Sequence, residues 1–515
     1  RGLDHISGIA VNQEDSALET ETKRIDPTLD GWSSESFNEH ALAQLKTIAA
    51  WLEGPRSTTP SGVFDETVNV SPLRPQELKQ VWGDSHFNIK RWEPQVKPQT
   101  TQTSPNELMS ALRGLLPVTT DVHAEFKIIS VETDEATAAA ATSTLVRCHF
   151  TAENSDLRVQ QNAAWNCRWT AATSESPKLA SIELVQFEEI QSNANALFGD
   201  RTHAVFQHEP CFSSQLAYSI DYWRDRLDWR FGWQAIGSHG VAIADVNGDG
   251  LDDVYVCETG GLPNRLLVQQ SDGTVRDISQ EANVAILEPT RSALLVDLDN
   301  DGDQDLIAAV ARFVLVFEND GSGKFKQHPT LQGASMIRSL SAADYDNDGL
   351  LDVYACGYNL NSGDAIGLGQ PMPYHDANNG APNYLMENEG NFRFKNVTDT
   401  AGLNSNNRRF SYAAAWEDFD NDGDLDLYVA NDYGRNNLYE NDNGQFRDIA
   451  ADAGVEDIAA GMSVSWGDYN RDGLPDLYVG NVFSSAGNRI AYQRKFKSDA
   501  DEQTKAIYQR HARGN

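Results

Sequence analysis

Five short acidic loops recur in the second half of this 515-residue chain. Each has the pattern Asp-x-Asp/Asn-x-Asp-Gly-x-x-Asp and runs directly into an apolar stretch. A motif that returns in this way indicates an array of similar structural units, and it constrains the fold of the C-terminal half more than any other feature. The loops begin at Asp245, Asp297, Asp344, Asp418 and Asp468.

The loops place oxygen-bearing side chains at positions 1, 3, 5 and 9. Calcium takes about six to eight oxygen ligands with flexible geometry. The backbone carbonyl at position 7 is expected to add a ligand, and the glycine at position 6 permits the positive φ that closes the loop. The sequence predicts about five calcium ions, held by Asp245, Asn247, Asp249, Leu251 and Asp253; Asp297, Asp299, Asp301, Asp303 and Asp305; Asp344, Asp346, Asp348, Leu350 and Asp352; Asp418, Asp420, Asp422, Asp424 and Asp426; and Asp468, Asn470, Asp472, Leu474 and Asp476.

Other interpretations of the loops are less consistent with the pattern. An EF-hand needs a Glu at position 12 between two helices, whereas here that position is Val or Ala within a strand-like run. Zinc favours His or Cys, which the loops lack, and magnesium rarely takes dedicated protein cages. A set of plain Asp/Gly turns is the remaining alternative. It is disfavoured because so many close carboxylates repel one another without a cation.

The sequence between the loops is also repetitive. Loop starts are 52, 47, 74 and 50 residues apart. A second signature, Asn-x-Leu-x-x-Asn followed by Gly-x-Phe, occurs at 383–392 and 436–446, with a looser copy at 317–325. A unit of roughly 50 residues with about four short strands has the size of a propeller blade.

At the level of these motifs, the loops resemble the FG-GAP/VCBS calcium-binding repeats of integrin α-subunit propellers. The whole unit is similar to the secreted acidic cartilage protein family and its bacterial relatives. The resemblance covers about residues 236–515 and implies a β-propeller with calcium in the hairpin loop of each blade. It also implies adhesion, matrix or ligand binding rather than one defined reaction.

Two departures from that family pattern shape the expectations. Such propellers usually have about seven blades, whereas about five complete blades are predicted here, and residues 510–515 look like the outer part of a blade about to continue. The propeller is therefore expected to be incomplete at its C-terminus, with a partner or further segment closing it. The longest spacing carries extra residues near 358–382, including Tyr374 and His375, which form either a packed loop or a functional one.

The N-terminal part has a different pattern. Residues 1–30 are predicted to be a flexible tail, and residues 31–200 an α+β domain. Helices are expected near 37–52, at 75–82 and, after a capping box at Ser104–Glu107, to about 116. Long strands are expected at 122–132, 139–152, 158–171 and 178–189. This element order resembles the cone-shaped fold of the nuclear transport factor 2 superfamily, which implies an enclosed pocket.

No paired acid and base is visible in that domain, so we expect no enzyme. Asp121, His123 and His149 are the possible catalytic residues, with a structural role as the alternative. Trp165 and Trp169 are interpreted as core or, alternatively, as a ligand wall. Residues 201–235 form an aromatic connector that joins the domains, packs on the propeller or offers a glycan platform, through Tyr218, Tyr222, Trp223, Trp229, Phe231 and Trp233.

Composition is consistent with a secreted calcium protein. The formal charge of −35 disfavours nucleic acid and anionic membrane surfaces as partners. No apolar run reaches the roughly 18 residues that a membrane-spanning helix needs. Cys148 and Cys167 fall on neighbouring predicted strands and could pair, although the odd total of five cysteines supports an oxidising compartment only weakly.

Three functions remain open at this point. The first is a secreted or cell-surface calcium-binding protein whose propeller face binds protein or glycan; a periplasmic location is also compatible. The second is a structural subunit of an extracellular assembly, for which a partner that completes the propeller would argue. The third is a calcium-dependent enzyme acting on polysaccharides, which would need a cleft with a basic or His/Tyr cluster.

Overall fold

A computed structural model gives the architecture of the chain. It describes residues 32–54, 60, 62–93, 98–116, 121–133, 142–153, 157–170, 176–192, 198–228, 240–333, 336–359, 371–373, 376–493 and 495–513. The chain divides into two compact units, Arg1–Phe198 with Ser484–Ala500, and Gly199–Phe483 with Asp501–Asn515. The predicted tail at 1–30 lies outside the described residues.

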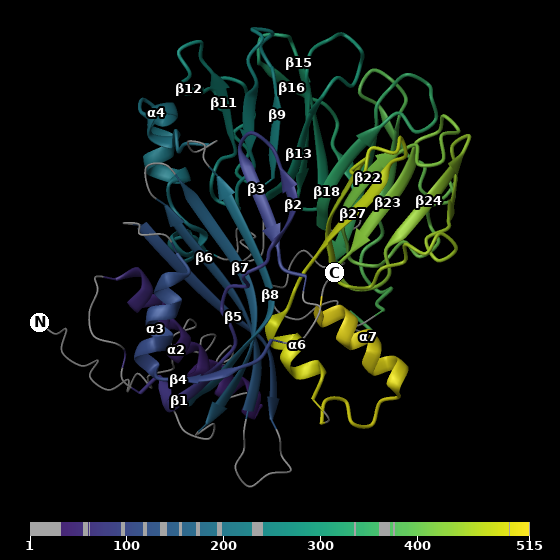
Figure 1. The fold of residues 1–515 in the computed structure, drawn as a ribbon. Helices are drawn as coiled ribbons and strands as arrows, with labels where there is room; N and C mark the ends of the chain where they lie inside the picture. The colour runs from purple at the N-terminus through teal and green to yellow at the C-terminus, as the bar shows by residue number, and fades with distance from the viewer. Residues whose placement is uncertain are drawn as a thin grey trace, which may run out of the picture. The chain divides into compact units, whose positions relative to one another are not determined.

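The first unit is built on one curved mixed sheet (Figure 1). Its main path runs β2-β3-β8-β7-β6-β5, while β1 pairs with β4 and, in parallel, with β8. The strands are β1 (Phe64–Val70), β2 (Lys79–Gly83), β3 (Phe87–Arg91), β4 (Thr101–Thr103), β5 (Asp121–Thr133), β6 (Thr142–Glu153), β7 (Arg158–Thr170) and β8 (Lys178–Ser192); the helices are α2 (Ser33–Glu53), α3 (Pro105–Gly114) and α6 (Ser485–Ala491).

One face of this sheet forms the core with helix α2. Phe37, Leu45 and Ile48 of α2 are buried because their spacings of eight and three residues place them on one helical face. Trp165 and Trp169 of β7 are 1% and 0% exposed in the same core, so their interpretation as core residues is confirmed. The capping box at Ser104 is also confirmed, since the Ser104 side chain accepts the Glu107 N–H and the Glu107 carboxylate accepts the Ser104 N–H.

Two local predictions for the first unit are wrong. The helix expected at 75–82 is replaced by strand β2, because Val81 and Trp82 suit a strand that pairs with β3, and this pairing overrides the helix signal of Pro75. Cys148 and Cys167 are free thiols. Cys148 lies opposite Ala163, four residues along β7 from Cys167, which is beyond the reach of a disulfide.

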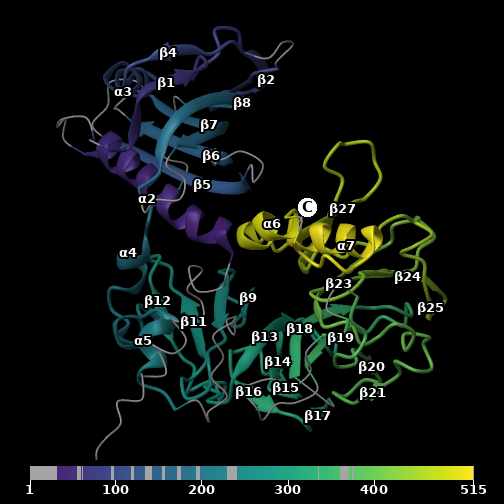
Figure 2. The ribbon, with the colours of Figure 1, turned by 90° about the horizontal axis from the view of Figure 1, so that it is seen from below.

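The second unit is a succession of antiparallel sheets that follow one another along a curve (Figure 2). The innermost strand of each sheet lies beside that of the next, so that β9, β13, β18, β22 and β26 form a row. The strands are β9 (Val241–Ala244), β10 (Asp253–Val256), β11 (Arg265–Gln269) and β12 (Val275–Asp277); β13 (Thr290–Val296), β14 (Asp305–Val310), β15 (Phe313–Asn319), β16 (Phe325–Gln327) and β17 (Leu331–Gln332); β18 (Met336–Ala343), β19 (Asp352–Asn359), β20 (Tyr384–Asn388) and β21 (Phe394–Asn396); β22 (Ser411–Glu417), β23 (Asp426–Asn431), β24 (Asn437–Asp442) and β25 (Gln445–Asp448); and β26 (Gly461–Gly467) and β27 (Asp476–Asn481).

The described residues complete four blades rather than the predicted five. Three sheets have four strands, the second has a fifth strand, β17, and the last has only β26 and β27. After β27 the chain enters helix α6 instead of a third strand, because the Asn-x-Leu-x-x-Asn signature does not recur there. The segment interpreted as a blade about to continue is in fact the end of helix α7 (Glu502–Arg513), with residues 514–515 outside the described part.

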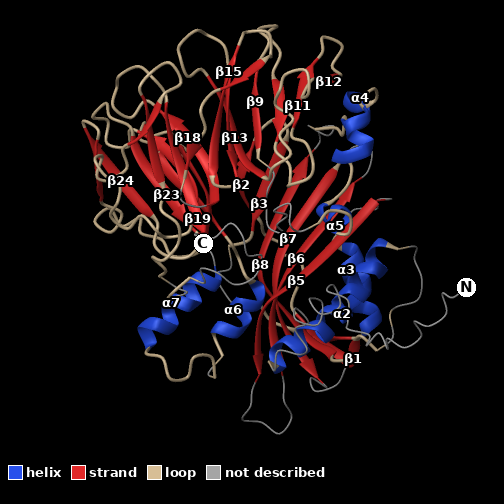
Figure 3. Cartoon of the chain, turned by 180° about the vertical axis from the view of Figure 1, so that it is seen from behind, coloured by secondary structure: helices blue, strands red, loops and turns tan. Residues whose placement is uncertain are grey.

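Domain boundaries also differ from the expectation in one segment. Residues 236–515 were predicted to form the propeller as a block, yet Ser484–Ala500 clusters with the first unit. The connector contains α4 (Thr202–Phe206), a short π-helix (Phe212–Leu216) and α5 (Ile220–Arg224), and Gln215 anchors it to blade 1 through Pro263 and Arg265. Trp229, Phe231 and Trp233 lie outside the described residues. Figure 3 shows how strands dominate and how loops join them at the sheet ends.

Candidate metal centre

All five acidic loops connect the first two strands of a sheet, and they share one backbone geometry. The glycine at position 6 has φ between +85° and +97° in every loop, and position 4 also has positive φ, including the non-glycine residues Asn300 and Arg471. The position-6 N–H donates to the position-1 carboxylate at 2.7–3.1 Å. The sequence pattern therefore produces a loop that wraps around its first aspartate.

The aspartate at position 9 starts the second strand and fixes the loop to the sheet. In the second blade, Asp305 accepts the Leu298 N–H at 3.0 Å and the Asn319 N–H at 2.8 Å. The counterparts in blades 1, 3 and 4, Asp253, Asp352 and Asp426, each accept two backbone N–H groups in the same way. Position 9 was predicted only as a metal ligand, and its role as a clamp between loop and third strand was missed.

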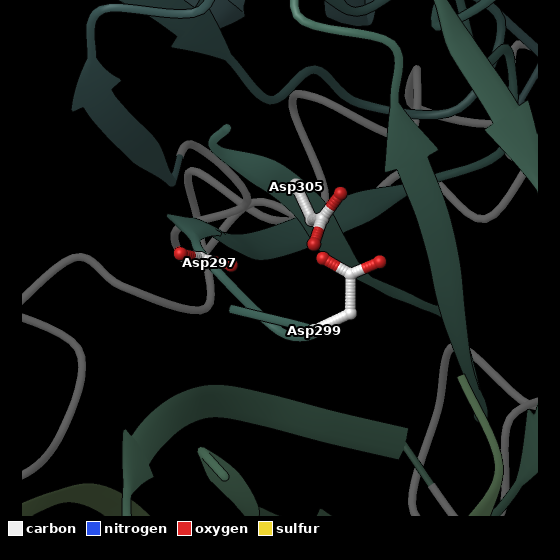
Figure 4. Close-up of side chains that lie close together, drawn as sticks. All are labelled: Asp297, Asp299 and Asp305. Carbon is white, nitrogen blue, oxygen red and sulfur yellow. The ribbon is translucent and has the colours of Figure 1, made fainter. Parts of the chain in front are cut away.

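Three loops bring carboxylate oxygens together closely enough to hold a cation. The oxygens of each cluster lie within 4.8 Å of one another. In the second loop, Asp299 and Asp305 turn their carboxylates toward each other with Asp297 beside them (Figure 4). The clusters are Asp297, Asp299 and Asp305; Asp344, Asp346 and Asp348; and Asp418, Asp420 and Asp426.

The second loop contains acceptors without donors. Oδ1 of Asp297 and Oδ1 of Asp299 are buried and have no hydrogen-bond partner. Buried polar atoms are nearly always paired, so two orphaned carboxylate oxygens in one loop require an explanation. A hard divalent cation fits this donor set, since it prefers oxygen ligands.

The electrostatics of the loops point in the same direction. Burial is the main cause that raises the pKa of the position-9 carboxyl groups, to about 6 for Asp305 and Asp426 and about 7 for Asp352. Two backbone N–H donors oppose this shift, while neighbouring loop carboxylates add to it. Burial followed by the adjacent aspartate also raises the pKa at position 3, in Asp299, Asp346 and Asp420. Burial and mutual repulsion therefore both disfavour the ionised form of these carboxyl groups.

The first and fifth loops differ at position 3, which is Asn247 and Asn470. Neither forms a three-carboxylate cluster within the described residues. Their hydrogen bonds otherwise match those of the other loops, including the Asp249 and Asp472 N–H groups that donate to the position-3 amide oxygen at 3.0 and 2.9 Å. The backbone frame is thus common to five loops, and the charge is concentrated in three.

The residues at position 7 offer only their backbone. The N–H groups of Leu251, Leu350 and Leu474 each donate to the position-5 carboxylate. The side chain of Asp424 accepts the Asn443 N–H at 2.7 Å and is turned away from its own loop. Asp303 occupies the same position, and its N–H donates to Asp301.

Asparagines that recur at the same position of three repeats link consecutive blades. Nδ2 of Asn388 donates to Leu298 O in the preceding loop at 2.9 Å, and Nδ2 of Asn319 and of Asn441 donate to the corresponding carbonyls of Val246 and Tyr345 at 2.8 Å. These are the second asparagines of the Asn-x-Leu-x-x-Asn signature or its looser copy. The motif was visible in the sequence, but its role in joining blades was not recognised.

The remaining predicted candidates lie in the first unit, where Asp121 and His123 line one pocket and His149 lines another. Nδ1 of His123 lies 2.7 Å from Glu53, and Nδ1 of His149 lies 3.0 Å from Oδ1 of Asn162. Asp121 is exposed at the start of β5. Tyr374 and His375 of the 358–382 insertion lie outside the described residues, so their role stays a prediction.

The fold of the second unit and its loops define a class of repeat protein, a β-propeller built from loop-bearing blades. In this class the chain carries FG-GAP-like repeats: the model of the FG-GAP-like repeat matches residues 245–308, 297–355 and 418–479. Each match starts at the first aspartate of one loop and ends in the strand after the next, so the matches cover all five loops. The predicted resemblance is confirmed.

Among curated proteins, cartilage acidic protein 1 is similar to this chain. The Xenopus tropicalis protein is 29% identical over 125 residues, covering 23% of this chain and 19% of that protein. The Homo sapiens protein is 27% identical over 127 residues, with the same coverage of 23% and 19%. The Mus musculus protein is 23% identical over 232 residues, covering 41% and 34%. The matched region therefore spans 34% or less of the length of these relatives.

Similarity to solved structures is weaker. A lectin from Agrocybe aegerita, described as recognising non-reducing terminal N-acetylglucosamine, has a TM-score of 0.30 and 12% identity, covering 70% of this chain and 75% of that one. A periplasmic gluconolactonase from Pseudomonas aeruginosa has a TM-score of 0.29 and 11% identity, covering 69% and 89%. Scores this low support no inference about function. Among the described residues, no helix has the length and apolar character to cross a membrane.

Proposed function

We propose that this chain is a calcium-binding extracellular protein whose FG-GAP-like blades form a rigid surface for binding protein or glycan. The predicted ligands of each loop would hold one ion. A bound ion would supply positive charge among the carboxylates. The chain's own residues shape the loops through the position-1 and position-9 hydrogen bonds described above.

The observation that carries this proposal is the pair of buried, unpartnered oxygens of Asp297 and Asp299. A plain Asp/Gly turn would pair those oxygens with backbone N–H groups or expose them to water. The raised pKa of Asp305, caused mainly by burial and partly by its acidic neighbours, adds support because it reflects charge that lacks compensation. An extracellular location fits, since extracellular calcium modules bind at about 10⁻⁴ to 10⁻³ M.

The test is a thermal melt combined with metal analysis of the full chain, in millimolar calcium and after chelation. We expect calcium to raise the melting temperature, because an ion that binds only the folded state stabilises it by mass action. About five ions per chain are expected, with the three all-Asp loops filling at lower calcium than the two with Asn at position 3. No bound calcium and no shift in melting temperature would reject the proposal.

A second candidate, a subunit of an extracellular assembly, is favoured by the outer edge of β27. Tyr478 in β27 is 72% exposed, whereas its counterparts Tyr255, Tyr354 and Tyr428 are 0% exposed. Within the described residues no strand pairs with that edge of β27, and unpaired edges invite strand addition. Sedimentation over a range of protein concentrations tests this role: association that Tyr478→Asp abolishes would support it, and a monomer at every concentration would count against self-assembly.

A further inference from the structure

A group of two arginines and a tyrosine lies at the far end of the inner strands from the acidic loops. Arg291, Arg338 and Tyr412 each stand six residues before the first aspartate of a loop, near the start of β13, β18 and β22. Six residues of extended strand span about 20 Å, so this group is remote from the loop carboxylates.

Hydrogen bonds hold these three strand starts side by side. Oγ of Ser292 accepts the Leu340 N–H at 3.2 Å, which links β13 to β18. Oγ of Ser339 donates to the Tyr412 carbonyl at 2.8 Å, which links β18 to β22. Because the neighbours of Arg291, Arg338 and Tyr412 are joined in this way, the three side chains gather at one end of the row of inner strands.

Arg291 is the unusual member of the group. The residue is only 6% exposed, and both its Nε and its Nη1 are buried without a hydrogen-bond partner. Burying an unpaired guanidinium is costly, and native proteins seldom retain one without a reason. Burial first, and the neighbouring charge of Arg338 second, lower the pKa of Arg291 to about 10, so it remains a cation at neutral pH.

Arg338 adds a second cation with an aromatic surround. Its Nη2 donates to the Tyr412 hydroxyl, and its guanidinium carbon lies 4.3 Å from the Tyr412 ring centroid and 5.6 Å from that of Tyr358. The Tyr358 hydroxyl donates to Asp432, a buried acidic residue that this contact brings into the cluster. Arg291 and Arg338 therefore place two guanidinium groups in one cluster of a chain whose net charge is −35.

We propose that Arg291 and Arg338 form an anion-binding site for an oxygen-bearing anionic group, either a carboxylate or a sulfate. The unpaired nitrogens of Arg291 are donors that such a group satisfies, and charge-assisted hydrogen bonds to oxyanions are the strong ones. Tyr358 and Tyr412 supply apolar ring surface beside the anion. This site gives a ligand class to the binding role proposed above. The inference rests on that role only for the purpose of the site, because none of these residues lies in a calcium loop.

The test uses the full, calcium-saturated chain and compares sodium acetate, sodium sulfate and sodium chloride at equal ionic strength. We expect acetate or sulfate to raise the melting temperature above that in chloride, and titration calorimetry to give a saturable isotherm. Acetate acting alone identifies a carboxylate site, and sulfate acting alone identifies a sulfate site. Equal melting temperatures in all three salts, with no isotherm, would overturn the proposal.

Variants separate a binding role from a structural one. Arg291→Met is expected to weaken anion binding by about ten-fold to a hundred-fold, while its melting temperature in chloride stays equal to or above that of the wild type, because an unpaired buried charge has been removed. Arg447→Met is the matched control: Arg447 is 69% exposed, ion-pairs with Glu440 and should leave the anion response unchanged. Arg291→Lys keeps the charge and should retain part of the response.

An Arg291→Met protein that melts lower in chloride and still shows the full anion response would assign Arg291 a structural role and overturn the inference. If that variant does not fold, Arg291→Lys decides the matter: an unchanged isotherm contradicts the site and a weakened one supports it. Calcium content is measured on the same samples. A wild-type chain that binds calcium but shows no anion response contradicts the anion site alone. A chain that shows the anion response but binds no calcium contradicts the calcium proposal alone.

Discussion

At the scale of single residues, the calcium proposal depends on the aspartate at position 3 of the loops. Asp299→Asn keeps an oxygen at this position and makes the second loop resemble the first, which has Asn247. In calcium we expect about ten-fold weaker binding at one site, because calcium affinity depends on the number of charged ligands. After chelation the variant should melt higher than the wild type, because the substitution removes the repulsion between Asp299 and the neighbouring carboxylates.

A metal ligand is distinguished from a turn residue by opposite changes in melting temperature, a fall in calcium and a rise after chelation. Calcium titrations followed by melting in calcium and in chelator measure both. Asp320→Asn is the control, because Asp320 caps a nearby turn through Ser322 and lies outside the three-carboxylate clusters. A fall in melting temperature of similar size in both conditions would assign Asp299 a structural role.

The raised pKa values of Asp305, Asp352 and Asp426 predict how pH affects the metal-free chain. An acid whose pKa is raised by folding binds its proton more tightly in the folded state, so its contribution is fully present below the ordinary pKa of about 4. That contribution is lost as pH rises through about 6 for Asp305 and Asp426 and about 7 for Asp352. Calcium-stripped protein should therefore melt higher at pH 5 than at pH 7.5.

High salt isolates these buried groups, because it screens exposed charges much more than buried ones. The decline between pH 5 and pH 7.5 should persist in high salt and disappear when calcium is restored. Calcium-free protein that becomes more stable as pH rises through this range would contradict the prediction.

Residue spacing predicts only part of the site. The ligand pattern and the glycine φ could be read from the sequence because both are local properties of nine consecutive residues. The second partner of Asp305, the Asn319 N–H, comes from a strand that starts beyond the loop, so the clamp depends on tertiary structure. The unpaired nitrogens of Arg291 were equally invisible, since burial without a partner has no signature in a sequence.

At the scale of elements, buried asparagines join each blade to the one before it. Asn388→Ala removes the amide that donates to Leu298 O at 2.9 Å and to Leu351 O at 3.2 Å. One buried and one partly buried carbonyl then lose a donor, and we expect the free energy of unfolding to fall by about 1–3 kcal/mol. Chemical denaturation in calcium measures this loss.

Asn404→Ala provides the comparison, because Asn404 is exposed and its Nδ2 donates to the exposed Asp399 side chain. It should change the free energy of unfolding little. An Asn388→Ala variant as stable as Asn404→Ala would show that packing alone joins the blades.

Strand prediction succeeded where one face of a sheet is buried. It failed where pairing with a neighbouring strand, rather than burial, determines that a segment is a strand. The long strands β5 to β8 alternate buried and exposed residues, and this alternation is visible in the sequence. Strand β2 has no such pattern, since all five of its residues are exposed, and only its pairing with β3 identifies it. The helix signal at Pro75 was local and was overridden by that pairing.

At the scale of the whole molecule, the sequence did not reveal that the chain returns to its first unit. Helix α6 follows the last blade in sequence, yet residues 484–500 cluster with the N-terminal unit, and residues 501–515 with the second. Repeats could be recognised because they are local in sequence. The return of α6 could not, because it depends on contacts between residues more than 350 positions apart, such as Asn488 with Ile129 O at 3.2 Å.

The contact that fixes α6 in the first unit is a buried ion pair. Nε of Arg489 donates to Oε1 of Glu35 at 2.9 Å, and its Nη1 donates to Ile128 O at 3.1 Å. The side chains of Arg489 and Glu35 are 7% and 1% exposed. A protein tolerates the replacement of both members of such a buried ion pair far better than the removal of one member.

Arg489→Met should therefore destabilise the first unit by about 3–5 kcal/mol, because it leaves the Glu35 carboxylate buried and uncompensated. The double variant Glu35→Leu with Arg489→Met should recover much of that loss. Hydrogen exchange measures the effect where it belongs: amides of α2 and β5 should lose protection in the single variant and regain it in the double one, while those of β14 and β19 stay protected in both. If exchange in α2 and β5 is unchanged by Arg489→Met, α6 is not part of the cooperative core of the first unit, and the N-terminal unit folds without the segment that follows the blades.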